Sequence, residues 1–355
     1  MKEFKTTRLA VTSAGCFLGA GYVSGQELWK FFGAFGVAGL PGRVMALAIQ
    51  LVFVILILQL GRKTGLSSLD RVLIPEEKPV LHSVVGIFQL IFLFGVTVVM
   101  AAGAGALVQQ MFHFPAALGG AVFCFLAMLV TFRGMEGLSK ICGVLVPAMI
   151  VTAMVISVIT VAKTGLHAVW VMPDVHDSPL IPNWWIAALT YVSYNIFGAI
   201  GVLTPVGPHV ADEKTLRKGS TLGVVMLLAI SLGILPAVGV RPDAALQELP
   251  MLALAEEIHP LLGYLYSVLL LTGMMGTTVS FWVAASIYVV QRKPDWEPVR
   301  KRVILVQAVL AFGGSLLGFG DLIGTFYPIF GYLGFAAMFL LLRHYLIVKK
   351  REKTV

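Results

Sequence analysis

Ten runs of apolar residues, joined by short polar connections, constrain this chain more than any other feature. A helix needs about 20 apolar residues to cross the roughly 30 Å hydrocarbon core of a bilayer. Lipid cannot hydrogen-bond a backbone, so only helices and closed barrels cross it, and runs of this length predict helices. The runs fall at 8–36, 39–61, 80–112, 114–132, 141–162, 184–209, 219–240, 260–290, 300–319 and 322–348. The sequence therefore predicts an all-α integral membrane protein with ten transmembrane helices.

The composition excludes several classes of protein. Of the 355 residues, 58% are hydrophobic and 12% are charged, whereas a soluble domain carries about 25% charged residues. The ten spans leave no polar stretch long enough for a separate domain that would bind nucleic acid. The sequence also shows no nucleophile with an orienting base, no phosphate loop and no metal-ligand cluster. We therefore expect neither an enzyme nor a cofactor.

The positions of the basic residues predict how the chain crosses the membrane. With the N-terminus inside, 22 of the 26 lysines and arginines fall in the inner segments. The exceptions are Lys30, Arg43, Lys163 and Arg241. Because inner loops carry the excess of basic residues, we expect both termini in the cytoplasm. The net charge of +8 then reflects topology, not nucleic-acid binding.

The order of the spans predicts an internal repeat. Five spans lie on each side of an outer loop, and an odd number of spans per repeat gives the two halves opposite orientations, as in inverted-repeat transporters. The predicted parts are a first repeat at 1–163, an outer connecting loop at 164–183, a second repeat at 184–348 and a cytoplasmic tail at 349–355.

The first and sixth spans each combine glycines with polar side chains midway through the membrane. Each glycine costs a helix about 1 kcal/mol relative to alanine, and intramembrane polar groups are usually functional. The first span holds Gly19, Gly21, Ser24, Gly25, Gln26 and Glu27, and the sixth holds Tyr194, Asn195, Phe197, Gly198 and Gly201. Glycines can instead serve close helix packing. The polar residues at equal depth in both halves favour two broken helices, near 19–24 and 195–201, with a binding site between them.

The segment GAGYVSGQELWKFFGAFG at 19–36 resembles the YkvI family of bacterial membrane proteins. That family is placed in the amino acid–polyamine–organocation superfamily and is similar in layout to the LeuT fold. The resemblance implies a bacterial inner-membrane protein with a five-plus-five inverted repeat. It also implies a small-molecule substrate between spans 1, 3, 6, 8 and 10, but names no substrate and no protein partner.

The leading hypothesis is a secondary transporter that works by alternating access, a cation-coupled symporter of a small amino acid or similar zwitterion. The substrate carboxylate would meet span 1 amides near Ser24 and Gly25, and its amino group would meet span 6 carbonyls near Asn195, together with Glu27. Aromatic gates would come from Tyr194, Phe197 and Tyr327. The predicted substrate-binding residues are Gly21, Ser24, Gly25, Glu27, Tyr194, Asn195, Phe197 and Gly198.

Sodium is the coupling ion that the resemblance favours. Sodium-coupled members of this fold bind the ion between spans 1 and 8, with two hydroxyls of span 8 and carbonyls of span 1. The corresponding residues are Thr277, Thr278 and the carbonyls of Met274, Gly19 and Tyr22. Alternatively, the two hydroxyls bond to carbonyls one turn back and bind no ion. Proton-coupled relatives carry a lysine in the middle of span 5, where this chain has none.

Glu27 is the one acidic residue well inside a predicted span. An intramembrane carboxylate points to function, so Glu27 is expected to bind substrate or to carry a coupling proton. Lys30 lies three residues later, so a local ion pair is the third alternative. Two further functions stay open: a ligand-sensing receptor subunit similar to germinant receptors, and a proton-coupled or uncoupled exchanger.

The predicted topology can be tested by labelling single cysteines in a variant that lacks Cys16, Cys124 and Cys142. A membrane-impermeant maleimide should label a cysteine in 163–183 on intact cells, and label one in 62–79 or 210–218 only after permeabilisation, because basic loops stay inside. Protection of the 163–183 position on intact cells would contradict the topology.

Overall fold

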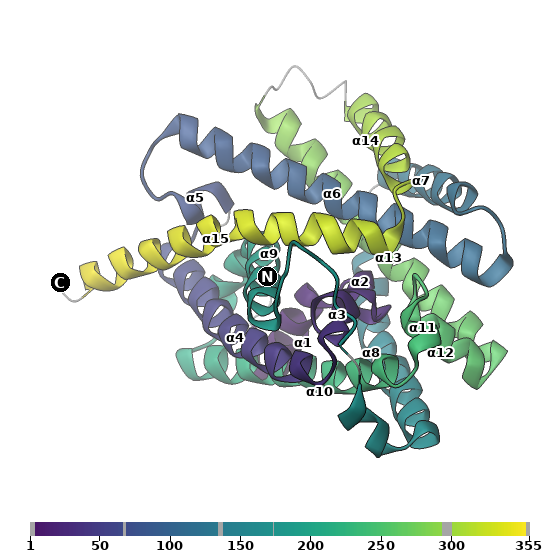
Figure 1. Ribbon diagram of the computed structural model, residues 1–355. Helices are drawn as coiled ribbons and strands as arrows, with labels where there is room; N and C mark the ends of the chain where they lie inside the picture. The colour runs from purple at the N-terminus through teal and green to yellow at the C-terminus, as the bar shows by residue number, and fades with distance from the viewer. Residues whose placement is uncertain (1–3, 67–68, 134–137, 173, 293–299, 353–355) are drawn as a thin grey trace.

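The computed structural model describes residues 4–66, 69–133, 138–172, 174–292 and 300–352 (Figure 1). These residues form α-helices and short 3-10 helices, with one isolated bridge between Phe4 and Val210. Parts of the predicted connections 133–140 and 291–302, and the end of the predicted tail 349–355, lie outside the described residues. The prediction of an all-α membrane protein is confirmed.

Each predicted apolar run contains helix. The elements are α1 (Thr6–Phe17), α2 (Ala20–Val23), α3 (Gln26–Phe31), η1 (Gly33–Ala38), α4 (Gly39–Thr64), α5 (Leu69–Leu73), α6 (Pro79–Phe112), α7 (Ala116–Arg133), α8 (Leu138–Thr164), η2 (Leu166–Val171), α9 (Trp184–Leu203), η3 (Thr204–His209), α10 (Glu213–Gly239), α11 (Pro242–Ala245), α12 (Pro250–Ile258), α13 (Pro260–Arg292), α14 (Arg300–Ser315) and α15 (Phe319–Glu352). Within the described part of the chain, seven helical stretches are long and apolar enough to span a membrane. The divided first run, the shorter apolar helix α7 and α14 complete a set compatible with ten spans.

The packing of the helices repeats between the two halves of the chain. Helix α1, in the first span of the first half, packs against α10, the second span of the second half. Helix α4, the second span of the first half, likewise packs against α9, the first span of the second half. The third and fourth spans of each half also pack together, as α6 with α7 and as α13 with α14. The fifth span of each half packs against the third span of the other half, as α8 with α13 and as α15 with α6. This is the pattern expected of two structural repeats. The repeat boundaries at residues 163 and 184 stay a prediction.

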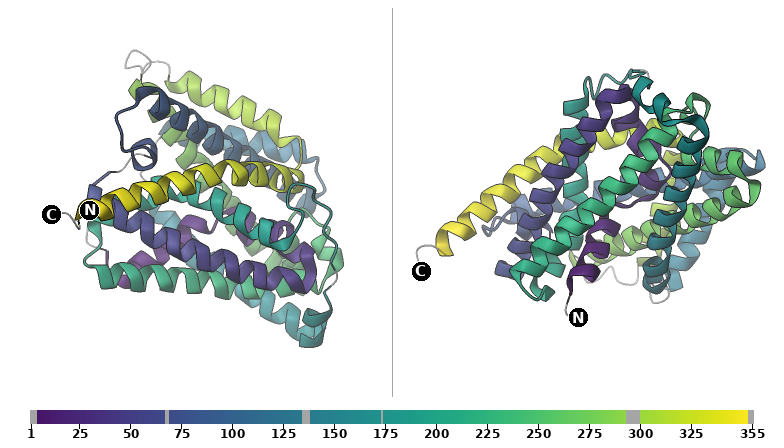
Figure 2. Two further views of the ribbon diagram at one scale, coloured as in Figure 1. Left: turned by 60° about the vertical axis from the view of Figure 1, so that its left-hand side comes forward. Right: turned by 90° about the horizontal axis from the view of Figure 1, so that it is seen from below.

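Helix α1 begins and α15 ends at the same end of the bundle (Figure 2). An even number of crossings requires this arrangement. The long α15 runs across the bundle and packs on α9, α4 and α6 (Figure 1).

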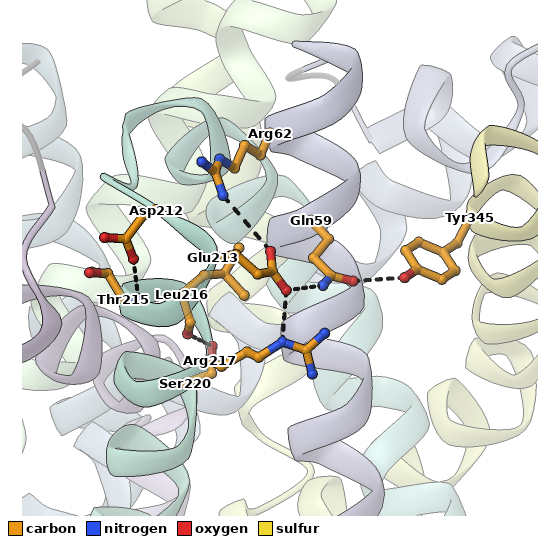
Figure 3. Close-up of polar contacts among 9 residues, drawn as sticks. All are labelled: Gln59, Arg62, Asp212, Glu213, Thr215, Leu216, Arg217, Ser220 and Tyr345. Atoms are coloured by element: carbon orange, nitrogen blue, oxygen red, sulfur yellow. Dashed lines mark hydrogen bonds and ion pairs between the residues drawn. The ribbon is translucent and has the colours of Figure 1, made fainter. Parts of the chain in front are cut away.

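A polar network joins three helices where α4 ends and α10 begins (Figure 3). The carboxylate of Glu213 accepts hydrogen bonds from Gln59 Nε2 (2.5 Å) and Arg217 Nε (2.8 Å), and lies 3.8 Å from Arg62 Nη1. Tyr345 of α15 donates to Gln59 Oε1 at 2.9 Å. The network therefore ties α4, α10 and α15 together at the end that the basic residues assign to the cytoplasm.

Close approach of two backbones at the same end depends on glycine. A Cβ on Gly61 of α4 would lie 2.1 Å from the carbonyl oxygen of Thr204, and one on Gly207 would lie 2.4 Å from that of Leu58. Helix α4 and η3 are therefore in direct backbone contact, which only the smallest residue permits.

Alanine substitutions should distinguish Gly61, which packs against another backbone, from a glycine without close neighbours. We expect Gly61→Ala to lower the melting temperature of the detergent-solubilised protein by several degrees, because overpacking costs about 1–3 kcal/mol. Gly313→Ala on α14 is the matched control, because its Cβ would meet nothing within 4 Å and alanine favours a helix by about 1 kcal/mol. Equal effects of the two substitutions would contradict the contact.

Candidate functional site

The first predicted span is interrupted twice near its middle. Helix α1 ends at Phe17, and Gly19 has an extended backbone with φ −78° and ψ 169°. A single turn, α2, follows, and Gly25 then takes the left-handed conformation with φ +86°, which favours glycine. The prediction of a break near 19–24 is confirmed.

Groups on neighbouring helices form hydrogen bonds with the backbone of this broken segment. The carbonyl of Val23 accepts from the Tyr266 hydroxyl of α13 (2.5 Å), and that of Ser24 accepts from the Met251 amide of α12 (2.9 Å). The Ser24 and Gly25 amides donate within the segment, to the carbonyls of Ala20 and Tyr22. A substrate carboxylate at these two amides, as the sequence predicts, would have to replace existing bonds.

The prediction of a break in the sixth span at 195–201 is wrong. Helix α9 runs without interruption through these residues. Asn195 donates its side-chain amide to the Tyr191 carbonyl one turn back (2.9 Å), so it needs no break to be bonded. A Cβ on Gly198 would lie 3.2 Å from the Phe92 ring, so this glycine serves packing. The chain instead changes to η3 at Thr204, where Pro205 and Pro208 follow and lack amide donors.

Glu27 of α3 is the centre of the site that the structure does assemble. The residue is 5% exposed, and its Oε1 accepts a 2.5 Å hydrogen bond from the Tyr194 hydroxyl of α9. Its Oε2 lies over Gly21, where a Cβ would be 2.9 Å away. The Tyr194 ring stacks on Tyr327 of α15 at 4.7 Å. Four of the residues named by the sequence are therefore together.

The ion pair between Glu27 and Lys30 does not form in the described part of the chain. The Lys30 side chain leans on α15, with its Cδ 3.8 Å from the Cβ position of Gly324. Because Glu27 bonds Tyr194 instead, the inert local pair is not the reason for its burial.

Two aromatic layers separate Glu27 from an apolar pocket. One turn beyond Tyr194 and Tyr327 lie Phe197 and Phe330, each packed edge-on against Phe92 at 5.2 Å. The pocket beyond them has a volume of about 200 Å³. It is lined by Leu73, Val85, Phe88, Phe197, Phe330, Leu333, Gly334, Ala336, Ala337 and Leu340. The aromatic side chains predicted as gates thus lie between the carboxylate and this pocket.

Arg43 is the functional candidate that the sequence analysis missed. It lies in α4 and is fully buried, although we counted it among the outer basic residues. Its Nε donates to Ser231 Oγ (2.9 Å) and its Nη2 donates to the Tyr22 hydroxyl (2.8 Å). Its guanidinium faces the Tyr191 ring at 4.7 Å. The available signal was an arginine at the fifth position of an apolar run.

The residues expected to hold sodium are only partly arranged for it. The Thr277 hydroxyl donates to the Gly273 carbonyl (3.1 Å), as in the alternative without an ion. The Gly19 carbonyl accepts from the amides of both Tyr22 and Val23 (3.1 Å each). Thr278 is fully buried, and its hydroxyl has no hydrogen-bond partner among the described residues. The sodium site, including Met274, stays a prediction.

Alanine substitutions should test the contact between Gly21 and the Glu27 carboxylate. We expect Gly21→Ala to lower the free energy of unfolding by about 1–3 kcal/mol, because a methyl group there displaces a buried carboxylate that Tyr194 holds. Gly19→Ala should have little effect, because its φ is negative and a Cβ would meet nothing within 4 Å. Thermal unfolding in detergent measures both. A tolerated Gly21→Ala would contradict the position of the carboxylate.

Comparison with known proteins finds relatives that match nearly the whole chain. No protein-family model matches the chain. The chain is 26% identical over 338 residues to the uncharacterized membrane protein YkvI of Bacillus subtilis strain 168, over 93% of each chain. It is also 26% identical over 343 residues to the uncharacterized protein YyaD of the same organism, over 94% of this chain and 95% of that one.

Among solved structures, the chain is similar to the inward-facing conformation of Mhp1, with TM-score 0.72 and 13% identity over 99% of this chain and 78% of that one. It is similar to MhsT in complex with L-phenylalanine, with TM-score 0.60 and 15% identity over 98% and 89%. It is also similar to a mutant of the Eremococcus coleocola manganese transporter, with TM-score 0.61 and 16% identity over 95% and 78%. Mhp1 is a transporter of the nucleobase-cation-symport-1 family, and the Eremococcus coleocola protein is a manganese transporter. The resemblance to YkvI is confirmed over nearly the whole chain, and the fold is LeuT-like.

Proposed function

We propose that this protein is a secondary transporter that carries a small amino acid or similar zwitterion across the bacterial inner membrane by alternating access, with both termini in the cytoplasm. The observation that carries the proposal is Glu27. It is a buried carboxylate on a broken helix, and it faces the tyrosines of α9 and α15 in a fold shared with transporters.

The partners of Glu27 support a cationic group on the substrate. A buried carboxylate is stable only when it is paired or well hydrogen-bonded. The neutral hydroxyl of Tyr194 donates a hydrogen bond to Glu27, and the neutral hydroxyl of Tyr191 faces the same carboxylate. Arg43 acts on Glu27 through its charge without direct contact. An ammonium group beside Glu27 would supply a positive charge in contact with it, and the stacked rings of Tyr194 and Tyr327 would supply faces that attract a cation.

The aromatic layers support alternating access. A substrate at Glu27 can reach the apolar pocket only if the rings of Tyr194 and Tyr327 part, and then those of Phe92, Phe197 and Phe330. These rings belong to α6, α9 and α15. Relative movement of the three helices would therefore open the site toward the end assigned to the cytoplasm, while the contacts of α12 with the broken segment close the other side.

We further propose sodium as the coupling ion, held by the hydroxyls of Thr277 and Thr278 and by the carbonyls of Gly19, Tyr22 and Met274. The unpartnered, buried hydroxyl of Thr278 supports this site, because a buried hydroxyl without a partner is costly. The packing of α2 on α13 brings the two contributing segments together. Thr277 would have to turn its hydroxyl away from Gly273.

Uptake into proteoliposomes tests the function. The experiment uses the full chain, a panel of radiolabelled amino acids, and an inward sodium gradient or none. We expect uptake of at least one amino acid that sodium stimulates. Replacing both Thr277 and Thr278 by valine should abolish the stimulation, because valine has nearly the shape of threonine but lacks the hydroxyl.

The control variant is Thr272→Val, whose hydroxyl bonds the Val268 carbonyl on the same helix and is not in the predicted ion site. It should keep the stimulation. Uptake driven equally well without sodium would overturn the coupling proposal. Binding of an amino acid without any flux would overturn transport and favour a ligand sensor.

A further inference from the structure

Arg43 has hydrogen-bond donors that the protein does not use. A guanidinium carries five N–H donors and no acceptor. The donors of Nε and Nη2 reach Ser231 and Tyr22, whereas Nη1 is buried and has no partner among the described residues. No carboxylate of the described chain forms an ion pair with Arg43. The charge of Glu27 acts on this buried cation, but without the direct contact of an ion pair.

The groups around Arg43 compensate its charge only in part. Its guanidinium lies 5.2, 5.4 and 4.7 Å from the ring centroids of Tyr22, Phe32 and Tyr191. Aromatic faces attract a cation, but they leave the N–H donors unbonded. Arginine is the side chain best suited to bind a carboxylate through two parallel hydrogen bonds. The unused donors therefore fit an anionic group of a ligand.

Tyr191 provides a second unused group beside the same position. It is fully buried, and its hydroxyl faces the Glu27 carboxylate without forming a hydrogen bond of regular geometry in the described residues. Its ring lies against Arg43 on one side and 5.5 Å from the Tyr194 ring on the other. Tyr194 in turn holds Glu27. Two tyrosines on consecutive turns of α9 therefore connect the buried cation to the buried anion.

The broken segment offers few other donors for an anion. The amides of Ser24 and Gly25, which the sequence predicted for this role, already donate to carbonyls of the same segment. The Gln26 amide is engaged too, because it points to Ser24 Oγ at 3.4 Å. Arg43 is a charged donor near the site whose Nη1 group is still unsatisfied.

We propose that Arg43 is the anion-binding half of the substrate site and Glu27 is the cation-binding half. The ligand's carboxylate binds Nη1 of Arg43 and the hydroxyl of Tyr191, and its ammonium group binds Glu27 beside Tyr194. One buried charge of each sign selects a zwitterion with both groups free, and rejects amines without a carboxylate and acids without an amine. This inference rests on the proposed function for the class of solute, but it concerns binding rather than coupling.

A structural role for Arg43 makes a different prediction. Through Tyr22 and Ser231, Arg43 also joins α2, α4 and α10. If Arg43 only connects these helices, its loss lowers the affinity for every ligand by the same factor. If Arg43 binds the carboxylate, its loss lowers the affinity only for ligands that have a carboxylate.

The test compares ligands that differ in one charged group. Using the purified full chain in detergent, equilibrium binding is measured for the amino acid that binds best, for its primary amide and for its des-amino acid. We expect the parent protein to prefer the amino acid over its amide by about 30-fold or more, as for a buried charge pair. In Arg43→Gln this preference should fall to about threefold or less. Arg43→Lys should restore part of it.

Two further variants sharpen the comparison. Glu27→Gln should remove the preference for the amino acid over its des-amino acid, and leave the preference over the amide. Tyr191→Phe keeps the ring against Arg43 and removes only the hydroxyl. It should therefore lower the affinity for the amino acid by about tenfold and leave the affinity for the amide nearly unchanged. Arg241→Gln is the control, because Arg241 pairs with Glu257 away from the site and should not alter any preference.

Each outcome decides the proposal. Equal loss for the amino acid and its amide in Arg43→Gln overturns it and leaves the proposed function standing. If Arg43→Gln fails to elute as a folded monodisperse protein, the same comparison in Tyr191→Phe decides, and equal effects on both ligands overturn the proposal. No binding of any amino acid by the parent protein overturns the proposed function and this inference together.

Discussion

A helix that is interrupted inside a membrane leaves backbone groups that lipid cannot bond, so other parts of the protein must bond them. In this chain, α13 supplies the Tyr266 hydroxyl to Val23, and α12 supplies the Met251 amide to Ser24. The short helices between α10 and α13 are therefore part of the structure that keeps the break open. With the backbone fixed in this way, Gly21 leaves room for the carboxylate of Glu27, and the site can form.

Much of this architecture could be predicted because its causes are local. Ten apolar runs follow from the length that a bilayer demands, and each run contains helix. The first break could be predicted because three glycines and three polar residues within nine positions have no reason to occupy a lipid-facing helix. Glu27 could be identified as central for the same reason, since an acidic residue at that depth needs a partner.

The errors concern residues whose roles depend on distant partners. Gly198 and Asn195 look like a break in sequence, but Phe92 of α6 fills the space beside the glycine, and Asn195 bonds its own helix. Arg43 was counted only as one of the few basic residues on the outer side of the membrane. Its burial depends on Ser231, which lies 188 residues away, and on the Tyr191 ring of α9. No local pattern specifies such contacts, which appear only when the two halves of the chain pack together.

The two charged halves of the proposed site lie on different helices of the chain. Glu27 belongs to α3 and is held by α9 and α15, whereas Arg43 belongs to α4 and is held by α2 and α10. A zwitterion that bridges them would stabilise the arrangement in which both groups converge, more than an arrangement in which they separate. A ligand shifts a conformational equilibrium only through such a difference in affinity. An amine or an acid that contacts one half alone gains no such difference, so recognition of both charges would also be the means by which the substrate drives the conformational change.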